Sequence, residues 1–217
     1  AGLPVRNAGT LGGNVANGSP IGDSMPLLIA LDAELVLASQ GGERTVPLHG
    51  FYTGYRRNVL QPDELLARVL VPLPKRPHPS ALPQAGGAAA KDGTEFLRAY
   101  KVSKRFDDDI SAICLVVRLE LDGGRVARVG IGAGGGAGTA VGAGPTEASL
   151  AGRPWTEDTA RQAAQMLREE FQPITDMRAS ADYRREVLGN LMHRFWLESQ
   201  GVQHLRLEQF SLQEVEA

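Results

Sequence analysis

The sequence predicts an α+β protein with antiparallel strands in its first two thirds and helices at its end. Residues 33–38 and 44–48 alternate apolar and polar side chains, which is typical of paired strands. Three later runs, 96–104, 112–121 and 125–131, read as strands separated by short connections. Two segments with helical periodicity close the chain. We therefore predict a three-stranded antiparallel sheet packed against C-terminal helices.

The turns support this order of strands. Gln40, Gly41 and Gly42 predict a hairpin between the first two strands, and the run Asp122-Gly123-Gly124 predicts another before Arg125. A short helical turn is expected over 48–55, followed by a strand at 65–71.

The closing helices show clear start and stop signals. Thr156 is an expected N-cap, and the acidic residues after it complement the helix dipole. The second helix is expected over 181–200, with Gly201 as its stop. Their apolar stripes predict core packing against the sheet; the residues of these stripes are Ala160, Ala163, Ala164, Leu167 and Phe171, then Leu188, Leu191, Met192, Phe195 and Trp196.

Bulk composition restricts the classes of function. The 217 residues are 42% hydrophobic and 22% charged, with a net charge of −2, so no basic stripe points to nucleic acid as a partner. No apolar run reaches membrane-spanning length and no signal peptide is visible, so no membrane partner is expected. The single cysteine, Cys114, lies in an apolar run and is expected to be buried. These features are typical of part of a cytoplasmic enzyme.

Acid–base and metal chemistry have little support. The histidines show no informative spacing for a nucleophilic triad, and none lies near another or near Cys114, so no metal site is predicted; they are His49, His78, His193 and His204.

The glycine-rich stretch from Asn7 to Asp23 is the first candidate for a binding site. Glycine allows consecutive backbone N–H groups to face a ligand, and Asp23 is an expected N-cap of a helix with Pro26 in its first turn. A helix start beside such a loop suits a phosphate or a polar cofactor. A purely structural turn is the alternative.

A second glycine-rich stretch, 130–144, has few side chains, and we expect a flexible connection there. The proline-rich run 72–92 is expected to be a long loop. The change in composition predicts a boundary, with one unit at 1–74, a linker at 75–93 and a compact α+β domain at 94–217.

Charged residues gather around the connection between the predicted strands 96–104 and 112–121. If the strand continued, Lys101 and Arg105 would lie on one face and could hold a cofactor anion, while Asp108 or Asp109 would fix the loop by pairing with an arginine. A solvated cluster of surface salt bridges is the alternative.

Four segments together resemble the flavin-carrying subunit of bacterial xanthine dehydrogenases, in the molybdenum hydroxylase family. They are NAGTLGGNVANGSPIGD, QPDELLARVLVP, FLRAYKVSKRFDDDIS and MRASADYRREVLGNLMHRF, in family order. The resemblance implies the remainder of a PCMH-type FAD-binding subdomain at 1–74 and a domain like the CO dehydrogenase flavoprotein C-terminal domain at 94–217. The family's first FAD subdomain and its iron–sulfur portion are absent, which implies a longer polypeptide or a multi-chain assembly.

The resemblance also implies residue roles. Gly9 and Thr10 fall where the family contacts the flavin through backbone and hydroxyl groups, and Gly12, Gly13 and Asn14 form the turn that lets the backbone approach it.

Three further matches complete the implied cofactor-binding set. Asp23 matches an aspartate that hydrogen-bonds the cofactor, and Leu66 an aliphatic residue against the isoalloxazine ring. Lys101 matches a lysine at the polar edge of the flavin, where positive charge stabilises its reduced form. Arg105 and Asp108 fall in the loop on the nicotinamide side. No residue is assigned to acid–base catalysis.

As a member of this family, the chain would bind FAD and relay electrons from [2Fe–2S] clusters to NAD during hydroxylation of hypoxanthine and xanthine to urate. The clusters and the molybdenum cofactor would lie on partners, the large molybdenum subunit and a [2Fe–2S] domain, in a hetero-oligomer. Alternatives are the flavin subunit of a CO dehydrogenase type and an assembly module without FAD.

Overall fold

The structure, a computed structural model, describes residues 7–73, 90, 93, 95–105 and 109–202. The first part of the chain combines short helices with a small sheet. Its elements are α2 (Leu11–Asn17), α3 (Ser24–Ala30), β1 (Glu34–Ser39), β2 (Gly42–Pro47), the 3-10 turn η1 (Leu48–Gly50), β3 (Tyr52–Gly54), β4 (Arg57–Asn58) and β5 (Leu65–Leu70).

The second part contains the larger sheet and the long helices. Its elements are β6 (Glu95–Val102), β7 (Ile113–Asp122), β8 (Arg125–Gly134), β9 (Val141–Gly142), α4 (Gly144–Leu150), α5 (Glu157–Glu170) and α6 (Ala181–Ser199). Of the predicted features, most of the 72–92 loop and the 75–93 linker, together with His78, His204 and Asp108, lie outside the described residues.

Antiparallel pairing joins the strands into sheets ordered β2-β1-β5, β3-β4 and β6-β7-β8-β9. The α+β prediction is confirmed, and both predicted hairpins form. The larger sheet has four strands rather than three, because the chain after β8 turns back and adds the short β9, where Gly132 pairs with Gly142. The expected helical turn at 48–55 is limited to η1 and gives way to β3.

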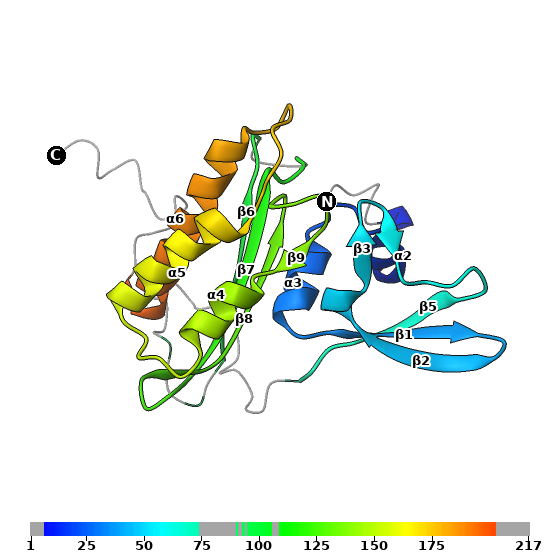
Figure 1. The fold of residues 1–217 in the computed structure, drawn as a ribbon, viewed down its shortest axis with the longest axis horizontal. Helices are drawn as coiled ribbons and strands as arrows, with labels where there is room; N and C mark the ends of the chain where they lie inside the picture. The colour runs from blue at the N-terminus through cyan, green and yellow to red at the C-terminus, as the bar shows by residue number, and fades with distance from the viewer. Residues whose placement is uncertain (1–6, 74–89, 91–92, 94, 106–108, 203–217) are drawn as a thin grey trace.

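The larger sheet is covered on both faces (Figure 1). Alternate residues of β7, including Ile113 and Leu115, pack with α5 and α6, as the apolar stripes predict. The intervening residues Cys114 and Val116 pack with Ala30 of α3 on the opposite face. Helix α3 therefore connects the glycine-rich N-terminal stretch to the sheet of the second part.

The 130–144 stretch corrects a prediction, because residues 130–134 belong to strand β8 and 141–142 form β9, so these parts are not a flexible connection. Gly130, Gly132 and Gly134 share the face of β8 that meets α3. A Cβ at Gly130 would lie 2.2 Å from the Ala30 carbonyl oxygen, and one at Gly132 only 2.0 Å from that of Pro26. The glycines allow the helix backbone to lie directly on the strand.

Helix α2 corrects a second expectation, since Gly12, Gly13 and Asn14 are expected in a turn and lie instead within this helix. The Thr10 hydroxyl caps it by accepting from the Gly13 N–H at 3.0 Å, and Gly18 ends it in the left-handed region at φ 59°. Glycine and asparagine are poor helix formers, so tertiary contacts must support this short helix.

A charged cluster joins the two parts of the chain. Arg118 on β7 is 2% exposed and donates to Glu95 at 2.7 Å and to Glu120 at 3.1 Å. Its guanidinium also lies 3.5 Å from Asp32, just after α3, and Arg128 donates to the same carboxylate at 2.7 Å. The cluster fixes the end of α3 against β7 and β8.

Candidate flavin site

Two pairs of the residues expected to contact the flavin are in contact with each other. A Cβ built on Gly12 of α2 would lie 4.0 Å from Leu66 Cδ2 on β5, so that helix and that strand are in contact. Later in the sequence, Asp23 directly precedes α3 and accepts a hydrogen bond from Lys101 of β6. The structure thus brings together residues from the beginning, middle and second half of the described chain.

The far end of α2 is held by the β3–β4 hairpin. The Tyr52 hydroxyl donates to the Val15 carbonyl at 2.7 Å, and the Asn58 amide donates to the Ala16 carbonyl at 3.1 Å. Carbonyls in the last turn of a helix lack intrahelical partners, so these bonds fix that end.

Asp23 precedes α3 as expected, but its side chain does not cap that helix. One carboxylate oxygen accepts from Lys101 Nζ at 2.8 Å, and the other accepts from Ser111 Oγ at 2.5 Å. The aspartate is therefore the point at which α3, β6 and the residues before β7 are tied together.

The same contact changes the expectation for Lys101. Its ammonium is ion-paired with Asp23 rather than free, and both side chains remain partly exposed. The net charge beside a ligand at this point is near zero. Burial, with the Asp23 carboxylate as a smaller cause, raises the pKa of the neighbouring Cys114 thiol to about 12, so Cys114 is the buried, neutral residue expected.

Asn14 is fixed from α3. Ser24 Oγ donates to Asn14 Oδ1 at 2.5 Å, which leaves the amide nitrogen available as a donor. This bond joins α2 to α3. Because Asp23 directly precedes Ser24, the bond also sets the distance between Asn14 and Asp23.

The predicted contact surface is open. Gly9, Thr10, Gly13, Asn14 and Lys101 are exposed. Gly12, Asp23 and Leu66 are half-buried.

This surface suits FAD in three ways. The N–H groups of Leu11 and Gly12 begin α2 without intrahelical partners and can meet polar oxygens, Leu66 offers an aliphatic surface for a flat ring, and the Asp23–Lys101 pair offers both donor and acceptor.

The loop after β6 differs in part from the expectation. Strand β6 ends at Val102, so Lys101 and Arg105 do not share a strand face. Arg105 instead pairs with Asp109 at 3.1 Å, and its N–H also donates to that carboxylate at 2.8 Å. The arginine, foremost through its side chain, lowers the pKa of Asp109. The predicted loop-fixing pair is thus confirmed for Asp109.

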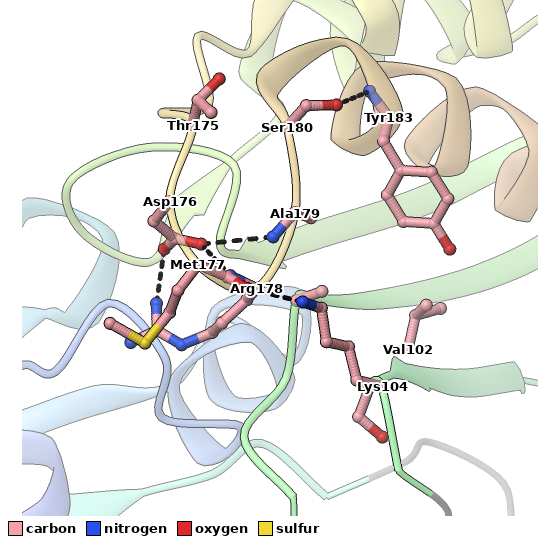
Figure 2. A pocket seen from close by; sticks show the side chains of 11 residues that line it. Val102, Lys104, Thr175, Asp176, Met177, Arg178, Ala179, Ser180 and Tyr183 are labelled. Atoms are coloured by element: carbon pink, nitrogen blue, oxygen red, sulfur yellow. Dashed lines mark hydrogen bonds and ion pairs between the residues drawn. The ribbon is translucent and has the colours of Figure 1, made fainter.

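An open cavity of about 620 Å³ lies at the end of β6 (Figure 2). Lys104 donates to the Met177 carbonyl at 2.7 Å, and Tyr183 extends from the start of α6 towards Val102. Ala112, which follows Ser111, also lines the cavity. The cavity therefore begins one residue from the Asp23 contact.

Hydrogen bonds to Asp176 hold the turn that lines this cavity. Asp176 accepts from the N–H groups of Arg178 and Ala179, and from the Arg178 and Arg184 guanidiniums at 2.5 and 2.6 Å. Burial would raise the pKa of Asp176, but these bonds outweigh it and hold the pKa below its usual value. The carboxylate stays charged and orders the turn before α6.

Sequence reasoning missed four residues that support the site. Ser24 and Ser111 hold predicted contact residues, and Tyr52 and Asn58 hold α2. Isolated serines carry no spacing signal, and the contacts of Tyr52 and Asn58 join positions 37 and 42 residues apart. Within the described ranges, no group of His, Cys, Asp and Glu is placed to hold a metal ion, and no helix is long and apolar enough to cross a membrane.

Two family models match the chain. The FAD binding domain in molybdopterin dehydrogenase matches residues 1–74, and the CO dehydrogenase flavoprotein C-terminal domain matches residues 98–199. The two matched ranges leave residues 75–97 between them.

Curated relatives cover most of this chain. The identity is 33% to nicotinate hydroxylase hnxS of Emericella nidulans and 33% to xanthine dehydrogenase/oxidase of Gallus gallus, over 90% and 91% of this chain and 14% of each relative. It is 30% to the carbon monoxide dehydrogenase medium chain of Hydrogenophaga pseudoflava, over 88% of this chain and 60% of the relative. The chain thus spans only part of each.

Solved structures agree. The carbon monoxide dehydrogenase of Hydrogenophaga pseudoflava, which lacks the Mo-pyranopterin moiety of its cofactor, matches with a TM-score of 0.75 at 30% identity, covering 89% of this chain and 61% of that one. Quinoline 2-oxidoreductase from Pseudomonas putida 86 matches at 0.73 and 26%, covering 92% and 63%. The chain belongs to the FAD-domain flavoproteins of the molybdenum hydroxylases.

Proposed function

We propose that the wall formed by α2, β5 and β6 binds FAD. The observation that supports this proposal is a chain of contacts: Gly12 lies beside Leu66, Asp23 pairs with Lys101, and the hydrogen bond from Ser24 to Asn14 joins α2 to α3 between these two pairs. Gly9 and Thr10 would offer backbone and hydroxyl groups, Gly13 holds the Thr10 hydroxyl in place through its N–H, Asn14 would offer an amide donor, and Leu66 would lie against the flat ring.

When bound, FAD would supply the electron- and hydride-transfer chemistry. The residues of this chain would orient the ring, exclude water from the side next to Leu66, and set the local charge through the Asp23–Lys101 pair. In the assembly, electrons would come from [2Fe–2S] clusters and a molybdenum centre on partner subunits or domains, and leave to NAD⁺. The chain would act as part of a cytoplasmic hetero-oligomeric oxidoreductase.

We further propose that the cavity at the end of β6 receives the acceptor, NAD⁺. Its lining includes Lys104, whose ammonium donates one bond to the Met177 carbonyl and keeps further N–H donors for a phosphate, and Tyr183, whose ring suits stacking. Its position one residue from Ser111 places it beside the proposed flavin wall. Xanthine-type purine hydroxylation is the assembly reaction we propose, with a CO dehydrogenase type as the second candidate, because relatives of both kinds match.

A pair of adjacent leucines tests the FAD proposal in the complete flavoprotein. Leu66 is half-buried and faces α2, whereas Leu65 is 62% exposed and lies on the other face of β5. Leu66→Glu places a carboxylate against the ring and should remove most bound flavin, as measured by absorbance after gel filtration. Leu65→Glu should retain it. Equal flavin content in both variants would refute the proposal, and wild-type protein without flavin would favour an assembly module.

The acceptor proposal is tested by separating the two half-reactions. Lys104→Ala should slow NAD⁺ reduction and leave flavin reduction by the substrate unchanged. Lys101→Ala, in the proposed flavin wall, should keep the fold and should slow NAD⁺ reduction as well. Arg185→Ala on the exposed side of α6 serves as the control, since Arg185 pairs only locally with Asp182. A wild-type assembly that reduces no NAD⁺ would favour the CO dehydrogenase type.

A further inference from the structure

Two serine hydroxyls hold the polar side chains of the proposed flavin wall. Ser111 Oγ donates to Asp23 Oδ1 at 2.5 Å, and Ser24 Oγ donates to Asn14 Oδ1 at 2.5 Å. Ser111 is 3% exposed, so its hydroxyl faces the protein. Neither hydroxyl needs to touch the cofactor to affect its binding.

We propose that Ser111 and Ser24 are positioning residues that orient the Asp23 carboxylate and the Asn14 amide for the flavin. The inference rests on the proposed FAD function and deepens it. It assigns to this chain a set of donors and acceptors for the cofactor, and a means of adjusting the flavin potential.

The Asp23 carboxylate is held at both oxygens. Lys101 binds one oxygen and Ser111 the other, so rotation of the carboxylate would break at least one bond. Each carboxylate oxygen can accept a second bond, so the fixed group presents acceptors to a ligand N–H or O–H. Ser111 is itself fixed, because the next residue, Ala112, donates its N–H to the Val102 carbonyl at 2.7 Å.

The Asn14 amide is held in one of its two orientations. With Oδ1 occupied by the Ser24 hydroxyl, the amide offers its NH₂ group to a ligand. The wall would therefore present a donor at Asn14 and acceptors at Asp23. A flavin carries both carbonyl acceptors and an N–H donor on its ring edge, so the pattern is complementary.

The charge on Asp23 gives Ser111 a second effect. A hydroxyl donor spreads the negative charge of a carboxylate, and without it more of that charge acts on the ring. Ser111→Ala should therefore lower the flavin midpoint potential, whereas Asp23→Asn should raise it. A residue that only fills space would leave the potential unchanged.

The test uses the complete flavoprotein with FAD as the probe, and measures the FAD dissociation constant by fluorescence and the midpoint potential by spectroelectrochemistry. Ser111→Ala should raise the dissociation constant roughly 10-fold, as expected for loss of a hydrogen bond to a charged group. Ser24→Ala should raise the dissociation constant by a smaller factor. Ser24→Thr, which keeps the hydroxyl, should have the dissociation constant of wild type. Ser39→Ala is the matched control, because the Ser39 hydroxyl accepts from the Gly41 N–H within the β1–β2 hairpin and holds neither Asp23 nor Asn14; it should match wild type.

The double variant Ser111→Ala/Asp23→Asn decides whether Ser111 acts through Asp23. Its dissociation constant and potential should equal those of Asp23→Asn alone. Full additivity of the two changes, or a Ser111→Ala protein that matches Ser39→Ala in both measurements, would overturn the inference while FAD binding by wild type still supports the proposed function. A wild-type protein that binds no FAD would overturn both.

Discussion

Replacing Gly132 by alanine tests whether the contact between α3 and β8 supports the candidate site. The added Cβ would lie 2.0 Å from the Pro26 carbonyl oxygen and 2.8 Å from its carbonyl carbon, well inside van der Waals contact. Both atoms belong to the helix backbone, so no side-chain rotation relieves the overlap. Relief requires α3 to move away from β8.

We expect this change to destabilise the fold by about 2–3 kcal/mol, the usual cost of overpacking a close-packed core. For a protein of this size, the melting temperature should fall by roughly 4–12 °C. Because Asp23 directly precedes α3, the same movement should lengthen its contact with Lys101 and weaken FAD binding.

Thermal unfolding followed by circular dichroism measures the first effect, and FAD titration the second. Gly144→Ala is the matched control, because Gly144 begins α4 and nothing lies within 4 Å of an added Cβ. It should change stability by less than about 0.5 kcal/mol. A Gly132→Ala protein with the melting temperature of the control would refute the close-packing argument.

Two further changes test the charged groups. Arg118→Met leaves two partly buried glutamates unpaired and should cost about 3 kcal/mol in urea unfolding, whereas an unchanged midpoint would show that the cluster adds nothing. Burial, with nearby acidic groups, raises the pKa of Glu147, so wild type loses stability as pH rises through that pKa. Glu147→Gln keeps an acceptor for the Ile131 N–H and should melt higher at pH 7, an advantage that disappears below about pH 4.3; equal pH profiles would contradict this.

The sequence predicts regular elements well where a local pattern decides them. Alternation located the main strands, and Thr156 located the start of α5 because a hydroxyl cap acts over three residues. The prediction from sequence failed at Gly130 and Gly132, where the glycine-rich composition resembles that of a flexible linker. Only the position of α3 shows that these glycines exist to remove Cβ atoms.

The candidate site shows the same division. Its contact residues could be named from a resemblance, but their partners could not. Asp23 has the position of a helix cap, yet a lysine 78 residues away and a serine 88 residues away take its carboxylate. Such long-range pairs depend on packing, which a single sequence does not display.

The central claim is that α2, β5 and β6 form one wall of a flavin site. An experimental structure of the complete FAD-loaded flavoprotein tests it most directly. We predict the isoalloxazine ring against Leu66, with Asp23 and Asn14 within hydrogen-bond distance of the cofactor. A flavin bound elsewhere, with Leu66 and Asp23 still facing solvent, would contradict the account.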